Sequence, residues 1–150
     1  GLGRLRAVLG PTVPWPEASR SVARAVSAWR LHAQGAFGPE PLVRADEHLL
    51  ALLLAADPYL TRDLVRRRLH PLHDQPVGVR RRAEQTLRAW LDAHGDVSAA
   101  AAALGVHPQT VRYRLTGLRE LFGDVLDDPV ARLELALALQ AAAPDDNGPG

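Results

Sequence analysis

Apolar side chains recur every three or four residues over most of the chain, a spacing that places them on one face of an α-helix. Three strong stretches of this kind cover residues 17–34, 46–56 and 78–94. Each is followed by glycine, or by aspartate and proline, which commonly end helices. The pattern predicts an all-α fold built as a helical bundle.

Further helices are expected in the second half of the chain, separated by short turns. In the helix over 78–94, Ala83, Leu87, Trp90 and Leu91 should face inward. The C-terminal residues PDDNGPG carry no apolar pattern and are expected to be disordered. The additional helices are predicted at about 58–70, 98–104, 108–122 and 129–143, with Asp57 capping the first of them.

The N-terminal residues depart from the helical pattern. The stretch RLRAVLG, residues 4–10, reads as one short β-strand, which is not stable alone. We expect it to be either disordered or the remnant of a sheet whose partner strands lie upstream. The helix over 17–34 then places Val22, Ala25, Val26 and Trp29 on one apolar stripe, and residues 35–44 are expected to form a loop.

Composition narrows the class of protein. No apolar stretch is long enough to cross a membrane, and the chain has no cysteine that could form a disulfide or a thiolate metal site. All 18 basic residues are arginine, and their distribution is uneven. Residues 76–122 contain seven arginines and four acidic residues, whereas residues 123–150 contain one arginine and six acidic residues. We expect a cytoplasmic protein whose basic middle region meets a polyanion.

A helix-turn-helix unit is predicted at residues 98–122. The first helix consists almost entirely of alanine, so Ala101 permits close approach of the second helix. Gly105 can adopt the left-handed backbone that reverses the chain. The pattern also fits an ordinary pair of antiparallel helices. The side chains expected to fill the space between the helices are Leu104, Val106, Val111 and Leu115.

The second helix of this unit has two chemically different faces. At about 100° per residue, Val111, Leu115, Leu118 and Phe122 face the core. The outward face carries Gln, Tyr, Thr and Arg side chains, which can bind base edges and phosphates in a major groove. Glu120, one turn further on, should limit the contact surface. The residues expected to contact DNA are His107, Gln109, Thr110, Arg112, Tyr113, Arg114 and Thr116.

Other interpretations of these residues stay open. Arg112 and Arg114 could form a solvated face, and Tyr113 could be a half-buried packing aromatic. His107 and Pro108 are expected to start the helix, whose N-terminal N–H groups would be free to bind a phosphate. Arginines 80–82 are better explained as a solvated helix start than as a binding patch.

Residues 86–139 resemble the C-terminal helix-turn-helix domain of the PucR/CdaR family of bacterial transcriptional regulators, with VHPQTVRYRL the most specific piece. The preceding LLLAADPYLTRDLVRRRLHPL is similar to the segment before that domain in the family. The resemblance implies sequence-specific binding of double-stranded DNA by a homodimer, with any effector ligand bound by an upstream region. Pro108 departs from the family, which often has a basic residue there, and so removes a phosphate contact.

These observations together predict how the chain is divided. Residues 1–45 would be the tail of an upstream regulatory domain or a linker helix, and residues 46–77 a connecting helical segment. Residues 78–143 would be the DNA-binding domain, and residues 144–150 a disordered tail.

Two other functions compete with DNA binding. An enzyme is disfavoured, because His70, His73 and Asp74 have no second ligand cluster and no motif positions a nucleophile or an acid–base pair. We therefore expect no catalytic residues, cofactor or bound metal. A helical module for protein–protein interaction or dimerisation, without direct DNA contact, is the stronger alternative. It is favoured by the large apolar surface of residues 22–31, 48–57 and 133–140.

Overall fold

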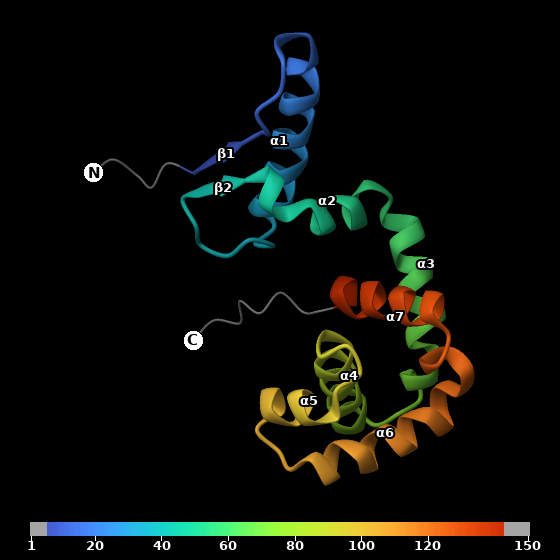
Figure 1. The fold of residues 1–150 in the computed structure, drawn as a ribbon. Coiled ribbons are helices and arrows are strands. Elements are labelled where there is room, and N and C mark those ends of the chain that lie inside the picture. Colours follow the sequence, from blue (N-terminus) through green and yellow to red (C-terminus); the bar gives the residue numbers. More distant parts are fainter. Residues whose placement is uncertain (1–5, 143–150) are drawn as a thin grey trace. The chain divides into compact units, whose positions relative to one another are not determined.

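The computed structural model describes residues 6–142, so the predicted tail at 144–150 and the first two residues of the predicted strand lie outside the described residues. The described residues up to Pro58 form one compact unit, and Tyr59–Ala142 form a second. Within these residues the chain contains the α-helices α1 to α7 and a sheet of two short strands. The prediction of an all-α fold is confirmed (Figure 1).

The first unit is built around one long helix. It comprises β1 (Ala7–Leu9), the 3-10 turn η1 (Trp15–Glu17), α1 (Ala18–Ala33), β2 (Leu42–Arg44), the 3-10 turn η2 (Ala45–His48) and α2 (Leu49–Ala56). The helices predicted over 17–34 and 46–56 are therefore present, although the second begins with a 3-10 turn.

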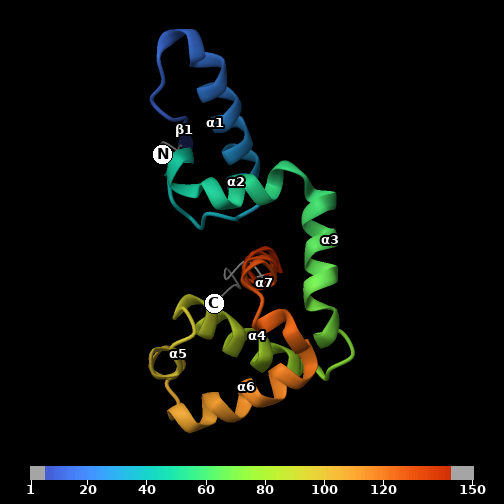
Figure 2. The same cartoon turned by 45° about the vertical axis from the view of Figure 1, so that its right-hand side comes forward.

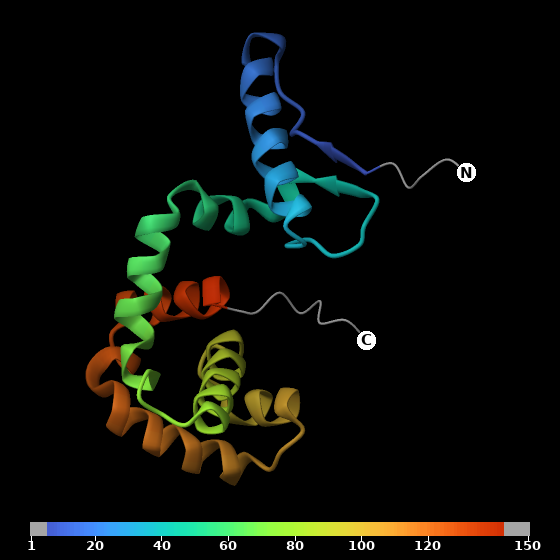
Figure 3. The same ribbon diagram turned by 180° about the vertical axis from the view of Figure 1, so that it is seen from behind.

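The strand near the N-terminus pairs in a way that the sequence did not indicate. β1 and β2 are parallel, with Ala7 opposite Leu42, and lie side by side at one end of α1 (Figure 3). The expectation of upstream partner strands was wrong: the partner lies downstream, at the end of the segment expected to be a loop. Three residues are too few to show an alternating pattern, but Val43 is only 2% exposed.

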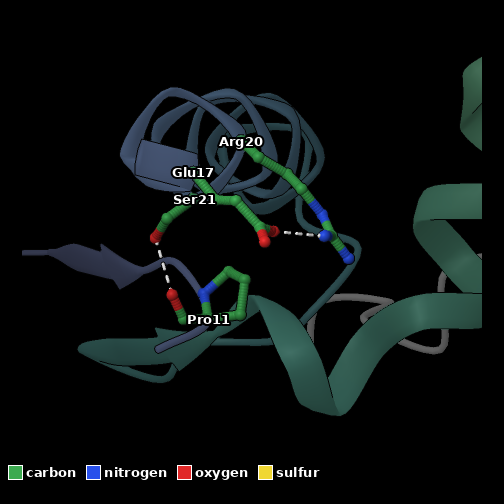
Figure 4. Close-up of polar contacts among 4 residues, drawn as sticks. All are labelled: Pro11, Glu17, Arg20 and Ser21. Atoms are coloured by element: carbon green, nitrogen blue, oxygen red, sulfur yellow. Dashed lines mark hydrogen bonds and ion pairs between the residues drawn. The ribbon is translucent and has the colours of Figure 1, made fainter. Parts of the chain in front are cut away.

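The chain before α1 folds back closely against that helix. The Ser21 hydroxyl donates a hydrogen bond to the Pro11 carbonyl at 2.8 Å, next to an Arg20–Glu17 ion pair at 2.6 Å (Figure 4). A Cβ at Gly10 would collide with the Ser21 backbone, so only glycine allows this approach. The contact connects β1 to the first turns of α1.

The buried face of α1 is offset from its apolar stripe. Val22 is 62% exposed, and Val26 and Trp29 are each 44% exposed, whereas Ala28 and His32 are buried. The strands and η2 pack against the face of α1 that carries Ala28 and His32. The large apolar side chains of α1 are therefore on a surface that the described residues of this unit do not cover.

The second unit is a helical bundle whose helices match the predicted ones closely (Figure 2). Gly95 and Gly105 both have positive φ angles and follow helices at the predicted places. The elements are α3 (Pro58–Leu69), the 3-10 turn η3 (His70–Leu72), α4 (Val77–Asp92), α5 (Val97–Leu104), α6 (Pro108–Phe122), the 3-10 turn η4 (Gly123–Leu126) and α7 (Pro129–Ala142).

One apolar core holds this bundle together. Ala83, Leu87 and Trp90 of α4 are buried in it, as expected, and Leu91 is partly buried against it. The indole N–H of Trp90 donates to the Gly95 carbonyl at 3.0 Å, so this large side chain is buried with its polar group satisfied. The core includes residues from η3, α4, α5, α6, η4 and α7. The inner face of α6 packs into this core.

Candidate nucleic-acid interface

The first helix of the predicted helix-turn-helix unit is short and tightly capped. The Asp96 carboxylate accepts hydrogen bonds from the N–H groups of Ser98 and Ala99, at 2.7 and 3.1 Å. Ala100 and Ala101 are both buried, and α5 packs closely against α4 and α6. Small side chains therefore allow the close approach that the sequence predicted.

The turn between α5 and α6 has the predicted left-handed backbone. Gly105 has φ 63° and ψ 33°, and the Val106 N–H donates to the Ala101 carbonyl at 3.0 Å. This arrangement satisfies carbonyl groups at the end of α5 and reverses the chain. Leu104 and Val106 pack against the core as partly buried side chains.

The inner face of α6 is the predicted one. Val111, Leu115, Leu118 and Phe122 are each no more than 5% exposed. They join α6 to the core of the second unit. The helix bounds, Pro108–Phe122, also agree with the prediction.

The outer face of α6 brings four of the predicted DNA-contacting residues together. Gln109, Arg112, Tyr113 and Thr116 are all exposed, and Tyr113 is 80% exposed. The interpretation of Tyr113 as a half-buried packing residue is therefore wrong. Arg112 donates to the Gln109 side-chain oxygen at 3.5 Å, which aligns these two side chains on one face. We call these four residues the outer strip of α6.

The start of α6 differs from its expected chemistry. His107 is the N-cap, and its Nδ1 accepts the Gln109 N–H at 3.2 Å. The Thr110 N–H donates to the His107 carbonyl at 2.9 Å, and Pro108 has no N–H group. The expectation of free N–H groups for a phosphate is therefore corrected, because the imidazole and the carbonyl of His107 already engage them. Thr110 itself is half-buried.

Arg114 is not part of the outer strip. It is half-buried, and its guanidinium donates to the hydroxyl of Thr86 on α4 at 3.4 Å. Thr86 is fully buried and donates in turn to the Arg82 carbonyl at 2.8 Å. Sequence reasoning missed Thr86. Its signal was a lone hydroxyl between the inward-facing Ala83 and Leu87 of an amphipathic helix.

The histidines considered as metal ligands do not assemble a site. The His73 ring lies 3.2 Å from the Asp74 carboxylate, but both side chains are highly exposed. Across residues 6–142, no three His, Asp or Glu side chains are grouped closely enough to hold a metal ion.

The helices in that same range are also too short or too polar to span a membrane.

Comparison with known proteins identifies this part of the chain. Residues 84–141 match the model of the PucR C-terminal helix-turn-helix domain. An uncharacterized protein of Thermomonospora curvata is 44% identical over 61 residues, which cover 41% of this chain and 33% of that protein. The purine catabolism regulatory protein of Bacillus subtilis is 44% identical over 55 residues, covering 37% of this chain and 10% of that protein.

The similarity also extends beyond the domain itself. An uncharacterized protein of Mycobacterium tuberculosis is 36% identical over 118 residues, which cover 77% of this chain and 27% of that protein. The chain thus spans about a third or less of the length of these relatives. The matched domain is a regulator domain, and it indicates DNA binding rather than catalysis. Residues 84–141 are therefore a helix-turn-helix domain of the kind found at the C-terminus of PucR regulators.

Proposed function

We propose that the chain is a sequence-specific DNA-binding part of a transcriptional regulator, and that α6 is the recognition helix placed in the major groove. The observation that carries this proposal is the outer strip of α6. Gln109, Arg112, Tyr113 and Thr116 are exposed on the face opposite the buried one, on the second helix of a helix-turn-helix.

The chemistry of the outer strip suits base edges. The Gln109 amide can bind adenine through one donor and one acceptor, and the Arg112 guanidinium can bind guanine through two donors. The two residues are three positions apart on α6 and extend from the same face, where Arg112 lies 3.5 Å from the Gln109 side-chain oxygen. Thr116 offers a hydroxyl, and its bond to the Arg112 carbonyl at 3.1 Å limits its rotation.

The rest of the proposal follows from the family. The regulator would act in the cytoplasm as a homodimer on a two-fold symmetric DNA site, with any effector bound by an upstream region. Residues 78–143 would form the DNA-binding domain, 46–77 a connecting helical segment and 1–45 the tail of an upstream regulatory domain or a linker helix. The exposed Val22, Val26 and Trp29 favour a packing partner for the first unit, which is compatible with either dimerisation or DNA binding.

Selection of bound sequences from random duplex DNA tests the function directly. We expect the parent chain to enrich one motif and to bind it with an affinity that falls steeply with salt. Arg112→Ala should weaken binding to that motif by about 1–3 kcal/mol. Arg67→Ala is the matched control. Arg67 is exposed on α3, and its substitution removes the same charge as Arg112→Ala does. Failure to enrich any motif, or equal effects of the two substitutions, would refute the assignment.

A further inference from the structure

A groove between α4 and α6 lies beside the outer strip of α6. Tyr113 and Thr116 belong both to the strip and to the lining of this groove. From α4 the lining includes Val79, Arg82 and Thr86, and from α6 it includes Arg114 and Glu120. A ligand that covers the outer strip therefore also meets the mouth of the groove.

The two arginines of the groove are free to bind an anion. Some arginines in the described part of the chain pair with acids, as Arg66 does with Asp63 and Arg68 with Glu134. No such ion pair is formed by Arg82 or by Arg114 within residues 6–142, although Glu120 also lines the groove. The lining of the groove carries two arginines and one acid, so its formal charge stays positive.

The buried hydroxyl of Thr86 sets the direction of Arg114. It accepts from the Arg114 guanidinium while it donates to the Arg82 carbonyl, so one side chain connects α6 to the turn of α4 that carries Arg82. Because Arg114 is half-buried and held toward α4, it cannot extend along the outer strip as Arg112 does. A guanidinium held at the side of a recognition helix is suited to the backbone of the duplex.

We infer that Arg82 and Arg114 bind the phosphate backbone of one DNA strand, and that Thr86 is a positioning residue for Arg114. This inference rests on the proposed DNA binding, and it assigns to Arg114 one of the two contacts, base edge or phosphate, that were open for arginine from the sequence. Phosphate contacts fix the orientation of a protein on the duplex, whereas base contacts specify the sequence. Arg82, which the sequence favoured as part of a solvated helix start, becomes a member of the interface.

The inference predicts a different signature for the groove than for the outer strip. Arg82→Ala and Arg114→Ala should each weaken binding by about tenfold. The loss should be equal for the selected duplex and for a duplex with one altered base pair. Each substitution should also reduce the slope of log affinity against log salt by about one. Arg112→Ala should instead reduce the preference between the two duplexes.

Thr86 allows a second, independent test. Thr86→Val keeps the shape of the side chain and removes the hydroxyl, so we expect it to weaken binding to both duplexes, with the protein still folded. Thr86→Ser restores the hydroxyl and should restore affinity. Rescue of this kind would not follow from a role in packing, because serine leaves a larger void than valine does.

The experiment is a fluorescence anisotropy titration of the full chain at several salt concentrations. Arg81→Ala is the matched control, since Arg81 is an exposed neighbour on α4 that does not line the groove, and it should leave affinity and salt slope unchanged. Parent-like binding by Arg82→Ala and Arg114→Ala, or a change of base preference in Arg114→Ala, would overturn the groove inference and leave the proposed function standing. Absence of binding by the parent chain would instead refute the proposed function, and the groove inference with it.

Discussion

Arg68 of α3 donates from Nε to Glu134 Oε2 of α7 at 2.6 Å, connecting two helices through residues that are 66 positions apart along the chain. The Arg68 side chain is only 15% exposed and that of Glu134 is 36% exposed, so water screens this pair less than a surface pair. The contact ties α3 to the bundle that contains the helix-turn-helix. The segment before that domain is thus anchored to it by a specific interaction.

Removal of one partner should destabilise the second unit measurably. We expect Glu134→Ala to lower the free energy of unfolding by about 1–2 kcal/mol, because Arg68 would lose its charge partner in a half-buried place. Asp63→Ala is the control, since the Arg66–Asp63 pair is exposed on both sides and should contribute little. Urea unfolding followed by circular dichroism gives both values. Equal losses in the two variants would contradict the prediction.

The two faces of α6 should respond to substitution in opposite ways. Leu115→Ala should cost roughly 2–5 kcal/mol of stability, because Leu115 is 1% exposed and its truncation leaves a cavity. Gln109→Ala should leave stability unchanged and weaken binding to the selected duplex by about 1–3 kcal/mol. Thermal melts and titrations on the same preparations compare the two. A folded Gln109→Ala protein that binds as tightly as the parent would remove Gln109 from the proposed interface.

The left-handed backbone of the turn can be tested by substituting Gly105, with Gly117 inside α6 as the comparison. Gly105→Ala should destabilise by about 1–2 kcal/mol, since φ 63° is unfavourable for a residue with a Cβ. No atom lies within 4 Å of the added Cβ, so the cost would come from the backbone alone. Gly117→Ala, inside α6 and also with open space, should stabilise by up to about 1 kcal/mol. The reverse order of melting temperatures would show that the turn is not formed as described.

Much of the second unit was predictable because its signals are local. Pro108 marks the first residue of α6, and Gly105 supplies a conformation that few other residues adopt. The inward set from Val111 to Phe122 follows from helical geometry alone. DNA contact by the outer strip stays a prediction, since it concerns a partner rather than the chain.

The remaining features depend on contacts between distant segments. β1 pairs with residues 42–44, and strands of three residues are too short to show an alternating apolar pattern in the sequence. The position of Arg114 depends on a hydroxyl 28 residues earlier in the chain. The buried face of α1 is set by the segments that pack against it, which bury Ala28 and His32 rather than Val22 and Val26. Apolar periodicity does not report those contacts.

The cap of α5 leads to a further prediction about charge. Asp96→Ala should cost about 1 kcal/mol, because two helix N–H groups lose their acceptor. Asp96→Ser should retain most of that stability and also remove a negative charge from the helix-turn-helix. We therefore expect Asp96→Ser to bind DNA more tightly than the parent at low salt, and equally at high salt. Salt-dependent titration checks this, and weaker binding at low salt would contradict it.

The parallel pairing of β1 with β2 has a practical consequence for dissecting the protein. Two parallel strands need a crossover connection, and here that connection contains α1. The sheet of the first unit therefore forms only when β1 pairs with β2, with Ala7 opposite Leu42. A truncation that starts within α1 would remove β1 and leave the backbone groups of β2 and the buried Val43 exposed, which favours aggregation. An expression fragment for crystals or DNA titrations should therefore start just before α3, which begins at Pro58 and opens the second compact unit, rather than within α1.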